Sequence, residues 1–393
     1  MKNSINDISS PIKEYFFVGA QRQKQELIRQ GRRIADLSIG NPDMPPPAEV
    51  LGRLKESLLQ PQNHGYQPNA GSSVLRNAVA SWYNRFFDAE VSPDGEIIPL
   101  QGSRQGILQL SQVLLKPGDE ALVPDPGYPS YSFAARMMGA TPVPYNLNIK
   151  NGFLPDLINL QNSDLSKVKI MWVNYPHMPT GAKALPDTFE QLVMFARQNN
   201  ILIVNDNAYT FVRNNSPQSI LSVAGAKDVA IELNSLSKNY NMAGWRLGFL
   251  AGNDEVLSIL SQLKSHLDSG IALPLQHAAA AALDLGYKWF APLNNAYNAR
   301  AKSAQKLAQA MDCALEGGDH GMFLWLKMPE TGMTSADFAH MLLHEAGVLL
   351  APGSLFGRNG EGHLRISLCA PEEQFEIAME NLKKSSVFNL KYN

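Results

Sequence analysis

The feature that most constrains the fold is a series of short apolar segments that each end in a polar or glycine-containing loop. Residues 201–204 run directly into Asn205 and Asp206, and residues 229–233 run into Asn234. The same pattern occurs at residues 96–100, 121–123 and 170–173. Short, mainly apolar runs of this length are typical of parallel strands that are buried on both faces.

Helical stretches separate these strands, for example at residues 106–115 and 187–199. The alternation predicts an α/β fold with a mostly parallel central sheet flanked by helices. Residues 249–251 read as one further strand, and the pattern leaves its direction open.

The pattern of predicted helices and strands changes after about residue 285. A long helical stretch there is followed by alternating strands and helices, at residues 294–313, 321–327, 335–345, 363–367 and 371–384. We therefore expect a large domain at residues 46–285 and a smaller α+β domain at residues 286–393. The N-terminal arm, residues 1–45, is expected to form part of the small domain.

Composition disfavours several classes of protein. The 34 Lys and Arg residues balance 36 Asp and Glu residues, so we expect neither nucleic acid nor membrane as a partner. Cys313 and Cys369 lie far apart without a CxxC spacing, which disfavours a disulfide scaffold and a thiolate metal site. No apolar run approaches the roughly 18 residues of a spanning helix. The first ten residues lack the apolar core of a signal peptide, and we expect a cytoplasmic protein.

Ligands of open α/β sheets bind beyond the carboxyl ends of the strands, so the polar residues there are the first candidates for a site. Lys238 closes the segment SLSK after one predicted strand, and Arg246 follows it. Desolvation and a nearby cation would lower the pKa of this lysine and expose a nucleophilic amine. If Lys238 is judged without its neighbouring motifs, the alternative is an ordinary loop lysine that is exposed to solvent.

Two further loops contain candidate site residues. Asp206, in the segment DNAY, would serve either as a helix N-cap or as a partner for the protonated nitrogen of a heteroaromatic cofactor. Gly102, Ser103 and Arg104 join a strand to a helix, where free backbone amides bind anions. A tight strand–helix turn explains these three residues equally well.

Together these segments resemble the class I and II aminotransferases, pyridoxal 5'-phosphate (PLP) enzymes of the aspartate aminotransferase fold, fold type I. The most specific motif is SLSK followed by RLG, with the arginine eight residues after the lysine. DNAY, the loop from Asn174 to Gly181, PDPGYP, GYQPNAGSSVLR, PGSLFG and HLRISL all occur in the order of the family. The resemblance implies a homodimer with a shared active site. It also implies ping-pong transfer of an amino group between an L-amino acid and a 2-oxo acid, in amino-acid biosynthesis.

The resemblance also implies a role for each matching residue. Lys238 would form the Schiff base with PLP and carry the Cα proton, Asp206 would pair with the ring nitrogen, and Tyr209 would donate to the ring O3′. The cofactor phosphate would be bound by Gly102, Ser103, Arg104, Ser235, Arg246 and, from the neighbouring subunit, Tyr66. Tyr128 would stack on the ring, Asn174 is retained from the family loop, and Arg365 would bind the substrate α-carboxylate near the Gly40 backbone. For Arg365 the alternative is a surface ion pair.

One position departs from the family pattern. The family loop usually reads N-x-P-x-N-P-T-G, and Met178 stands here at its second asparagine, which donates to O3′ in the family. A thioether cannot donate a hydrogen bond. We hypothesise that Tyr209 remains the main donor and that the Schiff base consequently has a raised pKa. His177 is expected to be exposed rather than to serve as a substitute donor.

The substrate stays open at this stage. The motifs are most similar to the branch of LL-diaminopimelate and aspartate aminotransferases. The diaminopimelate enzymes carry a glutamate, associated with the distal ammonium, where Asn69 stands here, so Asn69 disfavours diaminopimelate. Arg22, Arg33 and Arg104 are candidates for binding a distal carboxylate.

Two other functions on the same fold are considered. A carbon–sulfur lyase would release pyruvate and ammonia by β-elimination instead of forming pyridoxamine phosphate. A PLP-binding regulator usually carries an N-terminal DNA-binding domain, whereas only about 45 residues precede the predicted large domain, so a non-catalytic role is disfavoured.

Overall fold

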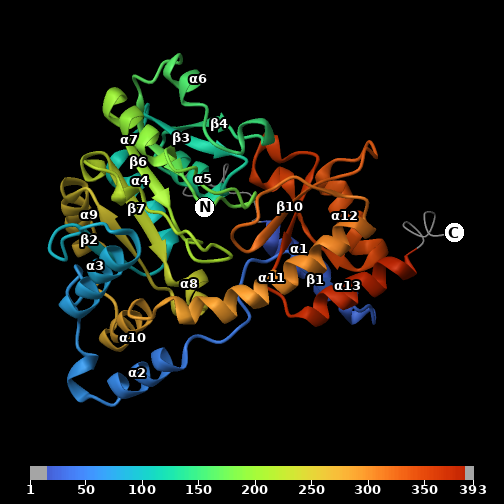
Figure 1. The fold of residues 1–393 in the computed structure, drawn as a ribbon, viewed down its shortest axis with the longest axis horizontal. Helices are drawn as coiled ribbons and strands as arrows, with labels where there is room; N and C mark the ends of the chain where they lie inside the picture. The colour runs from blue at the N-terminus through green and yellow to red at the C-terminus, as the bar shows by residue number, and fades with distance from the viewer. Residues whose placement is uncertain (1–15, 386–393) are drawn as a thin grey trace, which may run out of the picture.

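The computed structural model describes residues 16–385, and its centre is a seven-stranded sheet (Figure 1). The strand order is β2-β8-β7-β6-β5-β3-β4. The strands are β2 Ile97–Leu100, β3 Glu120–Asp125, β4 Thr141–Asn146, β5 Val168–Val173, β6 Leu202–Asp206, β7 Ala230–Ser235 and β8 Gly248–Gly252. β3 to β7 are parallel, and β8 is antiparallel to β2 and β7. The predicted α/β sheet is confirmed, and the direction of residues 249–251 is now known.

One strand of this sheet was not predicted. β4 contains Pro142 and Pro144, which cannot donate to a ladder and which argue against a strand from sequence. Within residues 16–385, β4 is an edge strand that pairs with β3 alone. Proline is tolerated there because one side of the strand needs no partner.

Helices cover both faces of the sheet. Those that pack on its strands are α3 Ser73–Phe87, α4 Ser103–Leu114, α5 Pro129–Met137, α7 Thr188–Asn199 and α9 Asp254–Leu267, and the same part of the chain also contains α6 Leu157–Gln161, α8 Leu236–Asn239 and α10 Leu273–Leu283. Successive strand residues point to opposite faces. Val204 therefore packs in a cluster with Leu110 of α4 and Leu260 of α9, whereas Ile203 packs in the larger core with α3 and α7. This alternation places neighbouring residues of one strand in two different environments.

The last third of the chain forms a second, smaller group of elements, including a four-stranded sheet of order β12-β13-β10-β9. The strands of this sheet are β9 Ala314–Leu315, β10 Phe323–Lys327, β12 Ala351–Pro352 and β13 His363–Ser367. The group also contains β11 Val348–Leu349 and the helices α11 Tyr287–Ala310, α12 Ser335–Ala346 and α13 Glu372–Lys384. α11 begins before the predicted residue 294. Phe290 stacks on Phe211 with ring centroids 4.2 Å apart, so a contact between distant segments stabilises this first turn.

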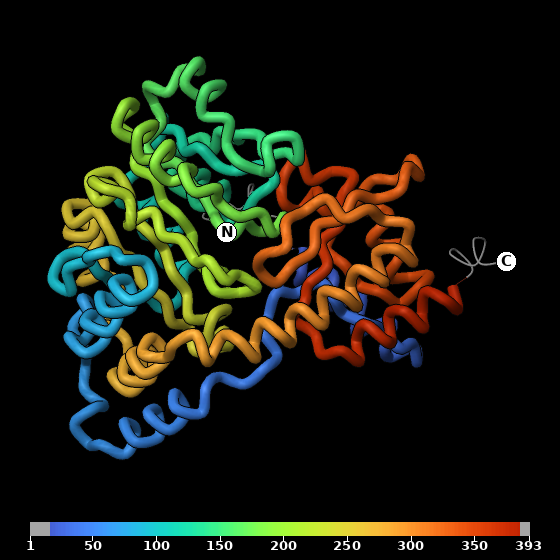
Figure 2. Tube along the Cα trace, in the orientation of Figure 1, coloured from blue at the N-terminus to red at the C-terminus, as the bar shows by residue number. Residues whose placement is uncertain are grey.

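The N-terminal segment lies against this smaller group. α1 (Phe16–Arg29) is followed by β1 (Ala35–Asp36), which pairs in parallel with β11. The chain then crosses to α2 (Ala48–Leu58), beside α10, as the blue tube in Figure 2 shows. Within residues 16–385, no helix is long and apolar enough to cross a membrane.

Candidate active site

A cavity of about 490 Å³ lies at the carboxyl ends of the parallel strands, facing the second sheet. Predicted site residues from both halves of the chain line it. They are Gly40, Ser103, Arg104, Tyr128, Asn174, Asp206, Tyr209, Ser235, Lys238, Arg246 and Arg365. The fold therefore brings together segments that are more than three hundred residues apart in the sequence.

Lys238 lies in the short helix α8, which Ser235 caps by accepting a hydrogen bond from the Ser237 amide. Its Nζ donates to the Gly40 carbonyl. Burial lowers the pKa of this lysine, and the positive charges of Arg365 and Arg246 lower it further. An amine with a lowered pKa is uncharged more often near neutral pH, so it can act as a nucleophile and as a proton carrier.

Asp206 ends β6 and faces the same cavity. Its Oδ2 accepts a hydrogen bond of 2.8 Å from the Tyr131 hydroxyl, and that ring stacks on Trp172. Its Oδ1 is buried and makes no hydrogen bond of good geometry with the described residues, although the nearby Ala208 amide lowers the pKa of the carboxyl group. Burial raises the pKa of this carboxyl group to about 6. One oxygen is thus held in place and the other is left to receive a donor from a ligand.

The side of the cavity at the start of α4 has the groups needed to bind an anion. Gly102 has φ +87°, and a Cβ there would lie 2.2 Å from Nη2 of Arg246. The glycine therefore lets the guanidinium approach the first turn of α4, which starts at Ser103. Arg104 adds a second guanidinium, whose Nε donates to the Tyr128 hydroxyl at 2.5 Å. Free amides of a helix N-terminus beside two arginines favour a dianion such as a phosphate.

Arg365 is a buried residue of β13, which excludes the surface ion pair considered from sequence. Its Nη2 donates to the Ser38 carbonyl at 2.7 Å, and its guanidinium lies 4.0 Å from the ring centre of Phe323 and 4.7 Å from that of Phe356. A planar cation held between rings is suited to bind a carboxylate in a bidentate pair.

The loop after β5 contains one correction. His177 is buried, so the expectation of an exposed histidine was wrong. The loop folds back on itself: the His177 amide donates to the Ala182 carbonyl, and its Nδ1 lies 2.8 Å from Oγ1 of Thr180. Burial lowers the pKa of His177 to about 3. The side chain does not line the cavity, whereas Met178 does, with its Sδ 3.3 Å from Nη1 of Arg365.

Some predicted residues lie outside the cavity. Gly102 stands behind Arg246, and Tyr66 has 93% of its surface exposed. Asn69 and Arg22 do not line the cavity either. Arg33 is on the surface, paired with Glu373 and Glu380.

The sequence reasoning missed other lining residues. Tyr131, which holds Asp206, lies three residues after Tyr128, so the repeated tyrosine in PDPGYPSYS was an available signal. Phe323, Ile39 and Ala208 also line the cavity. Ala208 belongs to the segment DNAY and Ile39 precedes Gly40, whereas no local pattern marks Phe323.

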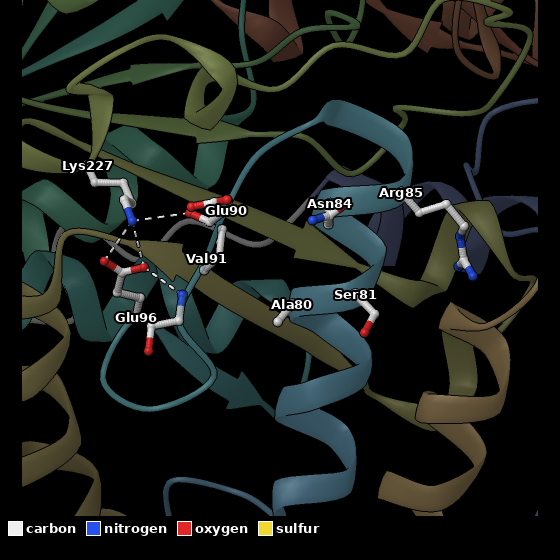
Figure 3. Close-up of a pocket in the computed structure, with 9 residues that line it drawn as sticks. Ala80, Ser81, Asn84, Arg85, Glu90, Val91, Glu96 and Lys227 are labelled. Carbon is white, nitrogen blue, oxygen red and sulfur yellow. Dashed lines mark hydrogen bonds and ion pairs between the residues drawn. The ribbon is translucent and has the colours of Figure 1, made fainter.

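A second hollow, of about 630 Å³, lies on the surface beside α3 (Figure 3). Its lysine, Lys227, pairs with Glu96 at 2.9 Å. None of the predicted site residues lines this hollow. Since its lysine already has an acidic partner there, the cavity at the strand ends is the better candidate for chemistry.

The chain was compared with known proteins. The family model for aminotransferase class I and II matches residues 32–382. The LL-diaminopimelate aminotransferase of Aquifex aeolicus is 41% identical over 94% of this chain and 96% of its own length. The structure of apo-BacF from Bacillus subtilis is similar with a TM-score of 0.94 and 34% identity, over 99% of this chain and 100% of that one. An aspartate aminotransferase double mutant from Thermus thermophilus has a TM-score of 0.89 and 26% identity, over 96% and 98% of the two chains.

The match covers nearly the whole chain and agrees with the architecture and with the cavity at the strand ends. The resemblance drawn from the motifs is therefore confirmed, and the chain belongs to the class I and II aminotransferases, which are PLP-dependent enzymes.

Proposed function

We propose that this cavity holds PLP and that its residues carry amino-group transfer in the roles expected from the motifs. The observation that carries the proposal is the buried Oδ1 of Asp206, which makes no hydrogen bond of good geometry with the described residues. A protonated ring nitrogen would supply a donor. Gly102 supports a phosphate site at the first turn of α4, since a side chain at Gly102 would collide with the Arg246 guanidinium and displace it from that turn. The residues present therefore fit the cofactor at both of its ends.

Bound PLP withdraws electrons from the substrate Cα through its cationic ring. Asp206 would keep the ring nitrogen protonated, and the Tyr209 hydroxyl would donate to O3′. Arg246, Ser235, Ser103, Arg104 and the amide of Gly102 would bind the phosphate, Tyr128 would pack on the ring, and Asn174 orients the loop that follows β5. The Asn174 amide donates to the Asp206 carbonyl, and its Oδ1 accepts from the Met178 amide at 2.7 Å, which supports that assignment.

The substrate is bound and deprotonated by the two remaining groups. Arg365 takes the α-carboxylate in a bidentate pair, with the Gly40 backbone beside it. The Lys238 amine, whose Nζ donates to the Gly40 carbonyl, would remove the Cα proton and deliver it to the C4′ carbon of the cofactor. The lowered pKa of Lys238 supports this role because an ammonium could not accept the proton.

Two observations bear on the amino donor, and they point in different directions. Relatives that cover almost the whole chain are LL-diaminopimelate aminotransferases, which supports diaminopimelate as a donor. Asn69 stands where such enzymes are expected to have a glutamate, which favours aspartate, glutamate or alanine instead. We propose a role in amino-acid biosynthesis with a donor from this group.

We further propose a cytoplasmic homodimer in which Tyr66 reaches the partner's cofactor phosphate. Its almost complete exposure supports this, as do exposed apolar side chains on the neighbouring helices, including Leu51, Leu59 and Val74. The domain limits proposed are those expected from sequence, at residues 46–285 and 286–393, with the first 45 residues joining the smaller domain. The balanced charge gives no reason to propose nucleic acid as a partner.

The function is tested by the visible absorbance of the PLP-loaded protein as single amino acids are added in turn. Loss of the visible band with glutamate, aspartate, alanine or diaminopimelate, together with formation of pyridoxamine phosphate, is the expected result and identifies the donor. Release of pyruvate and ammonia from cysteine or cystathionine instead would assign a lyase.

Two lysine variants make the test specific. Lys238→Ala is expected to abolish the visible band of the attached cofactor and to lower the rate by about 10²–10⁴, the usual contribution of a positioned acid–base group. Lys227→Ala, which changes the paired lysine of the surface hollow, should retain both properties. A normal band in Lys238→Ala would contradict the assigned role.

A further inference from the structure

We propose that Glu232 is a positioning residue for Asp206, acting through the two asparagines that flank it. The inference rests on the proposed pairing of Asp206 with the cofactor. Glu232 lies in β7, is completely buried, and does not line the cavity. It therefore cannot touch the substrate and acts only through other residues.

The Glu232 carboxylate is surrounded by hydrogen-bond donors. Oε1 accepts from Tyr83, Asn207, Ser219 and Asn234 at 3.0–3.3 Å, and Oε2 accepts from Asn205 and the Ile220 amide at 3.0 and 3.1 Å. These donors come from α3, from β6 and the residue directly after it, from β7, and from the segment at residues 219–220. One buried carboxylate thus ties four segments together behind the site.

The strand geometry connects this cluster to Asp206. Asn205 and Asn207 are two residues apart at the end of β6, so their side chains point to the same face of the sheet and Asp206 points to the other. In the register of the two strands, Asn205 stands opposite Glu232 and Asp206 opposite Leu233. Both neighbours of Asp206 are consequently bound to a single anion on the far face. A rotation of β6 that displaced the Asp206 carboxylate would have to break these two hydrogen bonds.

The cluster is not arranged for stability alone. Oδ1 of Asn205, Asn207 and Asn234 is buried without a hydrogen-bond partner among the described residues, because each amide turns its NH₂ group toward Glu232. Unpaired buried carbonyl groups destabilise a fold, and apolar residues of similar shape would avoid that cost. These unpaired amide oxygens are explained if the cluster serves to hold the end of β6 in place, because Asp206 at that end must meet the cofactor.

The test compares Glu232→Gln with the wild type in three measurements: the dissociation constant of PLP from the cofactor-free protein, the separate values of kcat and KM, and the melting temperature. We expect PLP binding and kcat to fall by about 10- to 100-fold, the size of effect that outer hydrogen-bond partners have at metal sites. KM for the amino acid should stay unchanged, because the residues proposed to bind it are untouched.

Leu307→Ala is the matched control. This buried leucine belongs to α11, which packs mainly on α13, β9 and β10, so its loss lowers stability without removing a hydrogen bond of β6 or β7. A Leu307→Ala protein with a similar melting temperature and normal PLP binding would separate positioning from general destabilisation. If Glu232→Gln does not fold, Asn205→Ala and Asn207→Ala carry the test, since each removes one of the two links and leaves the carboxylate in place.

Normal PLP binding and normal kcat in the folded Glu232 variant, or in both asparagine variants, would overturn the inference. So would a loss of PLP binding in Leu307→Ala equal to that in Glu232→Gln. A wild-type protein that binds no PLP and transfers no amino group would contradict the proposed function instead, so the two failures are distinguishable.

Discussion

Replacing Asp206 with asparagine is expected to stabilise the cofactor-free protein, although the same change weakens the active site. Burial raises the pKa of Asp206 from 3.8 to about 6. At about 1.36 kcal/mol for each pKa unit, keeping this group ionised at pH 8 costs the folded state about 3 kcal/mol. The neutral amide of the Asp206→Asn variant carries no charge and escapes that cost.

The pH dependence has a defined sign. Below pH 3.8 the carboxyl group is protonated in both the folded and the unfolded state, so it contributes no penalty. The penalty grows as the pH rises from 3.8 to about 6, because the unfolded chain loses its proton first, and it is complete above the folded pKa. The new amide nitrogen would lie where Oδ1 has no partner, which offsets about 1 kcal/mol or more of the gain. The advantage of the variant should therefore increase by about 1.4 kcal/mol between pH 5 and pH 8.

The assay is urea unfolding of the cofactor-free wild type and of Asp206→Asn at pH 5, 6.5 and 8. Asp228→Asn is the control, because Asp228 is an exposed aspartate paired with Arg197. Its effect on stability should show no comparable rise with pH. An Asp206→Asn protein whose relative stability stays constant or falls toward pH 8 would refute the reasoning that burial of this carboxylate destabilises the cofactor-free protein.

Three other changes have defined outcomes. Met178→Asn restores a hydrogen-bond donor beside the proposed O3′ position, so the visible band of the bound cofactor should titrate at a lower pH than in the wild type; an unchanged titration would contradict the hypothesis that Tyr209 acts alone. Arg365→Lys loses the bidentate geometry, and steady-state kinetics should show kcat/KM reduced by about 30-fold or more, corresponding to about 2 kcal/mol. Gly102→Ala places a Cβ 2.2 Å from Arg246, so PLP should dissociate more readily; Gly244→Ala, where the added atom meets nothing within 4 Å, should bind PLP as the wild type does.

The local sequence was sufficient for the main strands and for the residues at their ends. Apolar run length and periodicity are properties of neighbouring residues, and they located β5, β6 and β7 to within a few positions. The same reasoning missed β4, because its prolines are acceptable only at an edge, and whether a strand lies at the edge is decided by the whole sheet.

The motifs identified the family and eleven residues that line the cavity, because the chemistry of the site is concentrated in short segments that follow strands. What each residue touches was not predictable in the same way. The stacking of Tyr131 on Trp172, the placement of Arg365 between aromatic rings, and the burial of His177 all depend on segments that meet only in the folded chain.

The sequence by itself determined the fold class, the family and the polar residues at the strand ends, since these follow from local periodicity and from short motifs. Only the tertiary structure decided that Asp206 keeps one unpaired oxygen, that Lys238 lies against the Gly40 carbonyl, and that a buried Glu232 stands behind both flanking asparagines. The physical reason is that burial and hydrogen-bond pairing are properties of contacts between distant residues, and no window of sequence contains both partners.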